Sequence, residues 1–176
     1  TTYRWHMIIK IILLLCIVSI SVYTDIKENK IKNKYLLVAL ILGLAISLLT
    51  GGIAGIKDSL LGVIVPFILL FLFFAMRMFG AGDIKLFCTI GAIMGLNFAL
   101  NNIIYSFFLA GIVVISKIIF TGQLFKIIKG LYYYFKAMFL SRTIIEFHRI
   151  EGNRFPFGIA IFLGTIVQLI AKYNFI

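Results

Sequence analysis

The chain has 176 residues, of which 62% are hydrophobic and 13% charged, whereas a typical soluble domain has about 25% charged residues. This composition excludes a soluble globular protein and predicts an integral membrane protein. The net charge of +11 does not indicate nucleic-acid binding, because the basic residues flank apolar segments and the positive-inside bias of membrane proteins accounts for them.

The first half of the chain contains three apolar segments of 15 to 19 residues, close to the length of about 17 to 25 residues that a membrane-crossing helix needs. The first predicted span covers residues 6–24 and ends at Asp25. A basic loop follows and leads to the second span, residues 35–49. A turn at Thr50, Gly51 and Gly52 separates the second span from the third, residues 59–76.

The second half adds a fourth span, residues 84–96, and a fifth, residues 102–119. Asn97, Asn101 and Asn102 interrupt the apolar run between them and predict a tight hairpin turn. The last span covers residues 155–171. Residues 123–140 are basic and aromatic, which favours a helix lying in the membrane interface, although an additional crossing stays open. The expected fold is all-α, a polytopic membrane bundle of about six transmembrane helices in one domain, residues 1–176.

The distribution of lysine and arginine predicts the orientation. With six crossings, thirteen basic residues lie on one side of the membrane and four on the other, so the first side is expected to be cytoplasmic. This orientation places Asp25 and Asp83 on the same cytoplasmic side, at similar depth.

Acidic residues at a membrane boundary are costly and are therefore candidates for function. Asp25 ends the first span and Asp83 begins the fourth. Two carboxylates that lie close together share one proton, and such a pair can activate water and protonate a carbonyl oxygen, as in aspartic proteases. Gly80 and Gly82 lack side chains, so a peptide backbone could lie against them, and they allow unusual φ values.

Other interpretations of these acids stay open on the residues alone. Asp83 could simply cap a helix, and Asp25 could be a boundary residue balanced by nearby lysines. A small transporter or channel subunit that handles protons or cations would also place acids near a membrane. A non-catalytic scaffold is a third possibility.

Metal and disulfide sites are not expected. The two cysteines, Cys16 and Cys88, both fall inside predicted spans, without a CxxC motif. Glu146, His148 and Glu151 do not fall on one helical face. Asp58 is expected to cap a helix or to form a local ion pair, and Glu28 to be solvated.

Three motifs together resemble the type IV prepilin peptidases. Gly80-Ala-Gly-Asp-Ile-Lys-Leu86 is similar to their GxGD signature, which commonly continues as x-Lys. Asp25 is followed by Ile31-Lys-Asn33, similar to an Ile-Pro-Asn turn in which Lys32 replaces the proline. Arg154-Phe-Pro-Phe-Gly158 resembles the proline-containing start of the final helix. A presenilin-like peptidase fits less well, because its first acid lies in a Tyr-Asp motif.

The resemblance implies a membrane aspartyl endopeptidase of a prokaryotic plasma membrane, with its active site facing the cytoplasm. Asp25 and Asp83 would be the catalytic dyad, and Gly80 and Gly82 would contact the substrate. The expected partner, besides the lipid bilayer, is a prepilin-like or preflagellin-like precursor with a short basic leader and a hydrophobic helix. No cofactor and no methylation activity are expected, since paired CxxC motifs are lacking. The precursor, a bacterial or archaeal source and the oligomeric state stay open.

Overall fold

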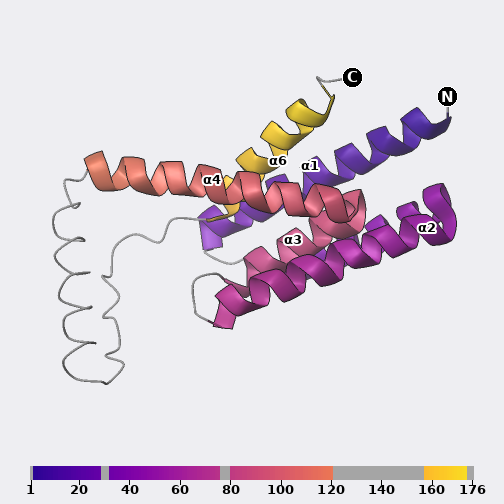
Figure 1. The fold of residues 1–176 in the computed structure, drawn as a ribbon, viewed down its shortest axis with the longest axis horizontal. Coiled ribbons are helices and arrows are strands. Elements are labelled where there is room, and N and C mark those ends of the chain that lie inside the picture. The colour runs from indigo at the N-terminus through magenta and orange to yellow at the C-terminus, as the bar shows by residue number, and fades with distance from the viewer. Residues whose placement is uncertain (1, 29–31, 76–79, 121–156, 174–176) are drawn as a thin grey trace. The chain divides into compact units, whose positions relative to one another are not determined.

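The computed structural model describes residues 2–28, 32–75, 80–120 and 157–173. These residues form five helices and no strand (Figure 1), namely α1 (Thr2–Glu28), α2 (Asn33–Ala75), α3 (Ala81–Met94), α4 (Leu96–Phe120) and α6 (Phe157–Tyr173). The predicted all-helical fold is confirmed. The segment 123–140, predicted to be interfacial or to cross, lies outside the described residues.

The chain packs as two compact units. The first unit comprises Thr1–Leu109 and Pro156–Ile176, and the second comprises Ala110–Phe155. The first unit contains α1, α2, α3, α6 and the beginning of α4, and everything that follows on packing concerns this unit. The organisation of residues 1–176 as a single domain stays a prediction.

Three of the described helices are long and apolar enough to cross a membrane: α1 over Trp5–Glu28, α2 over its full length, and α4 over Leu96–Ser116. The 43 residues of α2 cover two predicted spans, because the helix is interrupted at Gly52 with φ 57° and ψ −142°. The chain folds back there (Figure 1). Gly55 consequently lies so close to Ser47 that an added Cβ on Gly55 would meet the carbonyl oxygen of Ser47. The turn predicted at residues 50–52 is therefore present. The prediction of about six spans agrees in outline with the described helices.

The hairpin turn predicted from Asn97, Asn101 and Asn102 is wrong. The chain reverses at a single residue, Gly95, whose φ of 88° is accessible to glycine at little cost. Helix α4 therefore begins at Leu96 and contains all three asparagines. Asn102 is fully buried, and its side-chain amide bonds from α4 to α6 instead of forming a turn.

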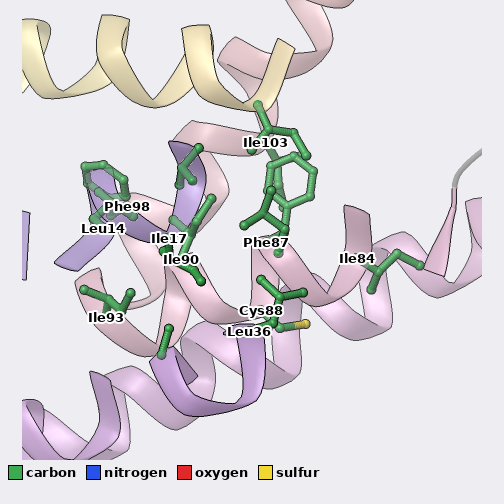
Figure 2. Packing of buried hydrophobic residues seen from close by; sticks show 14 of the residues in the cluster. Leu14, Ile17, Leu36, Ile84, Phe87, Cys88, Ile90, Ile93, Phe98 and Ile103 are labelled. Atoms are coloured by element: carbon green, nitrogen blue, oxygen red, sulfur yellow. The ribbon is translucent and has the colours of Figure 1, made fainter. Parts of the chain in front are cut away.

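Helix α3 is the centre of the first unit. Nine of its 14 residues are buried, from Ile84 to Ile93, and a helix that is apolar on all sides belongs inside a bundle. Figure 2 shows Phe87 and Ile90 of α3 among side chains of α1, α2 and α4. Large exposed hydrophobic residues of α1, α2 and α4, such as Ile12, Phe67 and Ile104, are the surface expected to face lipid.

Close backbone contacts fix the position of α3. A Cβ on Gly62 would lie 2.5 Å from the carbonyl oxygen of Gly91, and one on Gly43 would lie 2.8 Å from Cγ1 of Ile93. Small residues at helix crossings allow this approach in membrane proteins, where dispersion and hydrogen bonds drive association. Both halves of α2 thus hold α3 from its sides.

Helices α4 and α6 are joined by buried polar contacts. The Asn102 side-chain amide donates to Thr165 Oγ1 at 2.9 Å, and the Gln168 side-chain amide donates to the carbonyl oxygen of Phe98 at 2.9 Å. This register makes α6 antiparallel to α4. It also places the beginning of α6 at the same end of the unit as the end of α1 and the beginning of α3.

Candidate active site

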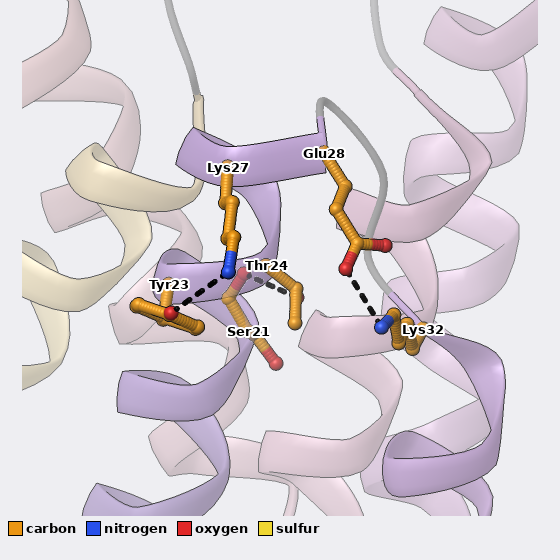
Figure 3. Close-up of polar contacts among 6 residues, drawn as sticks. All are labelled: Ser21, Tyr23, Thr24, Lys27, Glu28 and Lys32. Carbon is orange, nitrogen blue, oxygen red and sulfur yellow. Dashed lines mark hydrogen bonds and ion pairs between the residues drawn. The ribbon is translucent and has the colours of Figure 1, made fainter.

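Helix α1 extends beyond the predicted end of the first span. It ends at Glu28, so Asp25 lies in its last turn rather than in the following loop. Local polar contacts accompany this last turn (Figure 3): Thr24 Oγ1 donates to the carbonyl oxygen of Ser21 at 3.0 Å, and Lys27 Nζ donates to the Tyr23 hydroxyl at 3.4 Å. Asp25 is consequently carried by a regular helix, which fixes its direction better than a loop would.

Glu28 and Lys32 connect the end of α1 to the residue before α2. Their side chains form an ion pair at 2.7 Å (Figure 3), and both are exposed. Glu28 is therefore exposed, as predicted, and it is also paired. Lys32, which replaces the proline of the motif, supplies a different local link between the two helices.

The Asp25 carboxylate is half-buried and contacts the beginning of α6. Its Oδ2 accepts a hydrogen bond from the backbone N–H of Gly158 at 3.2 Å. Gly158 is the second residue of α6, where backbone N–H groups have no partner within the helix. The interaction therefore satisfies one of these N–H groups and positions the carboxylate.

Asp83 is the third residue of α3 and closes the beginning of that helix. Its Oδ2 accepts the backbone N–H of Gly80 at 3.2 Å, and its own N–H donates to the Gly80 carbonyl at 3.2 Å. The N-cap residue is Gly80 rather than Asp83, and Asp83 takes part in the cap from the third position of the helix. This role does not exclude chemistry, because only one carboxylate oxygen makes the capping bond. Each acid is held by a single backbone N–H beside a helix N-terminus.

The two acids interact electrostatically. Burial of the carboxyl, and then the nearby charge of Asp25, raise the pKa of Asp83 to about 6, against the opposing hydrogen bond from Gly80. A carboxyl with this pKa keeps its proton up to a higher pH than an exposed aspartate does. The structure therefore brings together the two acids that the sequence singled out. It also gives Asp83 a higher proton affinity than an exposed carboxyl has.

The glycines before Asp83 differ in their surroundings. Gly80 is exposed and Gly82 is half-buried in the first turn of α3. Gly80 has φ −77° and ψ 148°, an extended conformation open to any residue, so the unusual φ values that glycine allows are not used there. A Cβ on Gly80 would lie 3.2 Å from Oδ2 of Asp83, which gives a different reason for glycine. The substrate-binding role of both glycines stays a prediction.

Two further contacts at this end were not predicted as parts of a site. Gly158 belongs to a segment singled out by its motif, but nothing in the sequence pairs it with Asp25. Lys85 Nζ donates to Asn33 Oδ1 at 3.1 Å, which joins the residue two positions after Asp83 to the first residue of α2. The sequence offered one signal for these two contacts. Each of the three motifs contributes a residue to them, and motifs that belong to one site are expected to converge in space.

The remaining acids lie elsewhere or outside the described residues. Asp58 Oδ1 accepts the backbone N–H of Leu96 at 3.3 Å, so it caps a helix as expected, although the helix is α4 rather than its own. Glu146, His148 and Glu151 lie outside the described residues.

The fold and these contacts define a helical membrane protein with two interacting aspartates at one end of its central helix. A model of the type IV leader peptidase family matches residues 12–115, which is more than half of the chain and includes both acids. The chain belongs to the type IV leader peptidase family and is a protease of that general kind. Comparison with curated proteins and with solved structures gives no match.

Proposed function

We propose that this protein is an aspartyl endopeptidase that removes the short basic leader of prepilin-like or preflagellin-like precursors at the cytoplasmic face of a prokaryotic plasma membrane. The observation that carries the proposal is the electrostatic pairing of Asp25 and Asp83, with the pKa of Asp83 raised to about 6. Family membership supports proteolysis in general. The aspartyl chemistry and the precursor belong to the proposal.

The proposed chemistry uses the pair with one shared proton. One carboxylate takes a proton from a water molecule as the water oxygen bonds to the scissile carbonyl carbon, and the protonated partner donates its proton to the carbonyl oxygen. As the tetrahedral intermediate collapses and the C–N bond breaks, the partner carboxylate takes back a proton from one of the hydroxyl groups, and the leaving amine takes the proton that came from water. The pair then holds one shared proton again. Asp83 can hold this proton, because burial and the nearby charge of Asp25 raise its pKa to about 6.

The position of the acids suits a precursor with a polar leader joined to a hydrophobic helix. The acids lie at helix ends: Asp25 in the last turn of α1 and Asp83 in the first turn of α3. A hydrophobic substrate helix packed along the bundle would present its polar end, and hence the leader junction, at this level. A transporter would instead favour acids deep within the membrane.

The proposed orientation rests on the charge distribution. The described lysines nearest the acids, such as Lys27, Lys32 and Lys85, lie at the end of the unit where α1 ends and α3 begins. The positive-inside rule assigns such an end to the cytoplasm. We propose a multi-pass topology with this end inside, and the alternating direction of the helices supports the repeated crossings.

The proposal is tested by co-expression with candidate precursors from the same genome, with the precursor's size followed on a gel. Asp25→Asn and Asp83→Asn are each expected to abolish shortening of the precursor, because an amide can neither take nor give the proton. Membrane-fraction levels and thermal unfolding in detergent establish that both variants are inserted and folded.

Glu28→Gln is the matched control, because Glu28 lies three residues after Asp25 and its exposed carboxylate contacts Lys32 rather than the dyad. This variant is expected to cleave at about the parent rate. Cleavage that survives in well-inserted Asp25→Asn or Asp83→Asn protein would show that the dyad is not the catalytic centre.

A further inference from the structure

A cluster of four aromatic rings joins four helices at the beginning of α6. Phe157 is the first residue of α6. Its ring centre lies 5.8 Å from that of Phe107 on α4, at an interplanar angle of 67°, and 6.4 Å from that of Phe87 on α3, at 58°. The ring of Phe107 also lies 6.1 Å from that of Phe73 on α2. Tilted and edge-on arrangements at these distances are favourable for aromatic rings, so the cluster holds the beginning of α6 against its neighbours.

Phe87 connects this cluster to Asp83. It follows Asp83 by four residues in α3, so the two side chains lie on the same face of the helix, one turn apart. Phe87 is 1% exposed and points from α3 toward α6 (Figure 2). Long side chains of a helix lean toward its N-terminus, which here is the end that holds Asp83. The ring of Phe157 therefore contacts the part of α3 that carries this acid.

Phe157 is also bonded to the group that holds Asp25. The N–H that donates to Asp25 Oδ2 at 3.2 Å belongs to the peptide unit between Phe157 and Gly158. Because a peptide unit is planar and rigid, this N–H moves with the Cα of Phe157. The hydrogen bonds between the side chains of α6 and α4 begin at Thr165, about two turns further along the helix. The ring of Phe157 thus acts much closer to this N–H than those bonds do.

We propose that Phe157 is a positioning residue that sets the relative position of the two acids. Its ring holds α6 against Phe87, and its peptide unit carries the N–H that holds Asp25. The two carboxyls belong to different helices and share no hydrogen bond within the described residues, so this route through α6 connects them. As far as cleavage is concerned, the inference rests on the proposed function, because the pair of acids is the centre of that chemistry.

The first test is cleavage of a precursor by the full chain. Phe157→Leu removes the ring and keeps an apolar side chain, so the Gly158 N–H shifts. We expect kcat to fall about tenfold or more, the cost of displacing a reacting group by a fraction of an ångström to 1 Å, with KM unchanged within about twofold. Phe87→Leu should lose a similar factor, and the double variant should lose no more than either variant alone. Phe157→Tyr, which keeps the ring, should cleave at nearly the parent rate.

The titration of Asp83 is a second readout, and it needs no substrate. Among the described residues, Asp25 of α1 is the charged group that acts on Asp83, and its charge, after burial, raises the pKa of Asp83. Lys85 bonds to Asn33 of α2, and the aromatic rings from α4 and α6 carry no charge. Phe157→Leu lets the two carboxyls move apart and lets water enter. NMR of isotope-labelled aspartate should therefore show the pKa of Asp83 falling toward its ordinary value.

Phe98→Leu is the matched control for loss of a buried ring. Phe98 is 2% exposed and lies beside the other end of α6, with its ring centre 5.6 Å from Lys172 Nζ. This variant should also lower the thermal stability, and it should leave kcat and the titration of Asp83 unchanged. Equal kcat and equal Asp83 titration in Phe157→Leu and Phe98→Leu overturn the positioning role.

The two readouts separate this inference from the proposed function. A parent protein that cleaves no precursor refutes the proposed function, whereas a shifted Asp83 titration in Phe157→Leu still supports the positioning role. Cleavage that depends on both acids and is unchanged in Phe157→Leu overturns the positioning role alone. If Phe157→Leu fails to fold in a thermal scan, Phe87→Leu decides the result by the same two readouts.

Discussion

Replacement of Gly158 by alanine tests whether the beginning of α6 positions Asp25. The added Cβ would lie 2.8 Å from Oδ2 of Asp25, and ordinary contact begins at 3.4 Å, so the carboxylate oxygen has to move by about 0.6 Å. Such a movement away from the helix lengthens the 3.2 Å bond from the Gly158 N–H to about 3.8 Å, which is beyond hydrogen-bonding range.

The effect should appear in activity rather than in stability. The clashing atom is the end of a flexible, half-exposed side chain, and water can replace the lost hydrogen bond, so we expect a change of less than about 1 kcal/mol in the free energy of unfolding. Displacement of a reacting group by a fraction of an ångström to 1 Å costs about 10- to 100-fold in rate.

The assay is cleavage of a precursor by purified protein in detergent, with a thermal scan of the same samples. Gly111→Ala is the matched control, since it makes the same substitution in a helix with nothing within 4 Å of the added Cβ. Cleavage by Gly158→Ala within about twofold of Gly111→Ala, a range far below the expected loss, would refute the positioning role of the Asp25–Gly158 contact.

Three further predictions follow from the same contacts. Because the folded-state pKa of Asp83 is raised from 3.8 to about 6, the folded protein binds a proton that the unfolded chain releases, and stability should rise as the pH falls from about 6 toward 4. Asp83→Asn should lose this rise and melt at a higher temperature than the parent at pH 7, as thermal scans across this pH range will show; identical profiles for variant and parent would contradict the assignment. Cleavage should decline as the pH rises above about 6, because the pair then loses its shared proton, and a rate that is flat between pH 6 and pH 8.5 would rule this out. Gly91→Ala should destabilise the protein by about 1–3 kcal/mol, because its Cβ would meet the backbone of Gly62, whereas Gly51→Ala, with open space around it, should melt like the parent.

Several features of the fold were predictable because they depend on local chemistry. Apolar length alone predicts α1, and the glycine pair at residues 51–52 predicts the reversal inside α2, which occurs at Gly52. The reversal between α3 and α4 was misplaced, because asparagine is a common turn residue and also a common partner between membrane helices. Asn102 serves the second purpose, and one glycine makes the turn.

The two acids of the candidate site were predictable from the sequence, although their catalytic role stays a prediction, and the groups that support them were not predictable. Acids are rare in this chain, and a membrane boundary makes each one conspicuous, so Asp25 and Asp83 were found without coordinates. The partner of Asp25 is a backbone N–H 133 positions later in the chain, and a backbone group leaves no trace in residue identity beyond the need for glycine. The Asn33–Lys85 contact was not predicted for a similar reason, since neither asparagine nor lysine is unusual at these positions.

The shortness of α3 has a consequence for the membrane itself. Fourteen residues rise about 21 Å, whereas the hydrocarbon layer is about 30 Å thick. The central helix of the bundle is thus shorter than the hydrocarbon layer, and we expect water or lipid headgroups to enter the layer at one end of this helix. A dent of this kind at the Asp83 end would let water reach a peptide bond that the flat surface of a bilayer would keep dry.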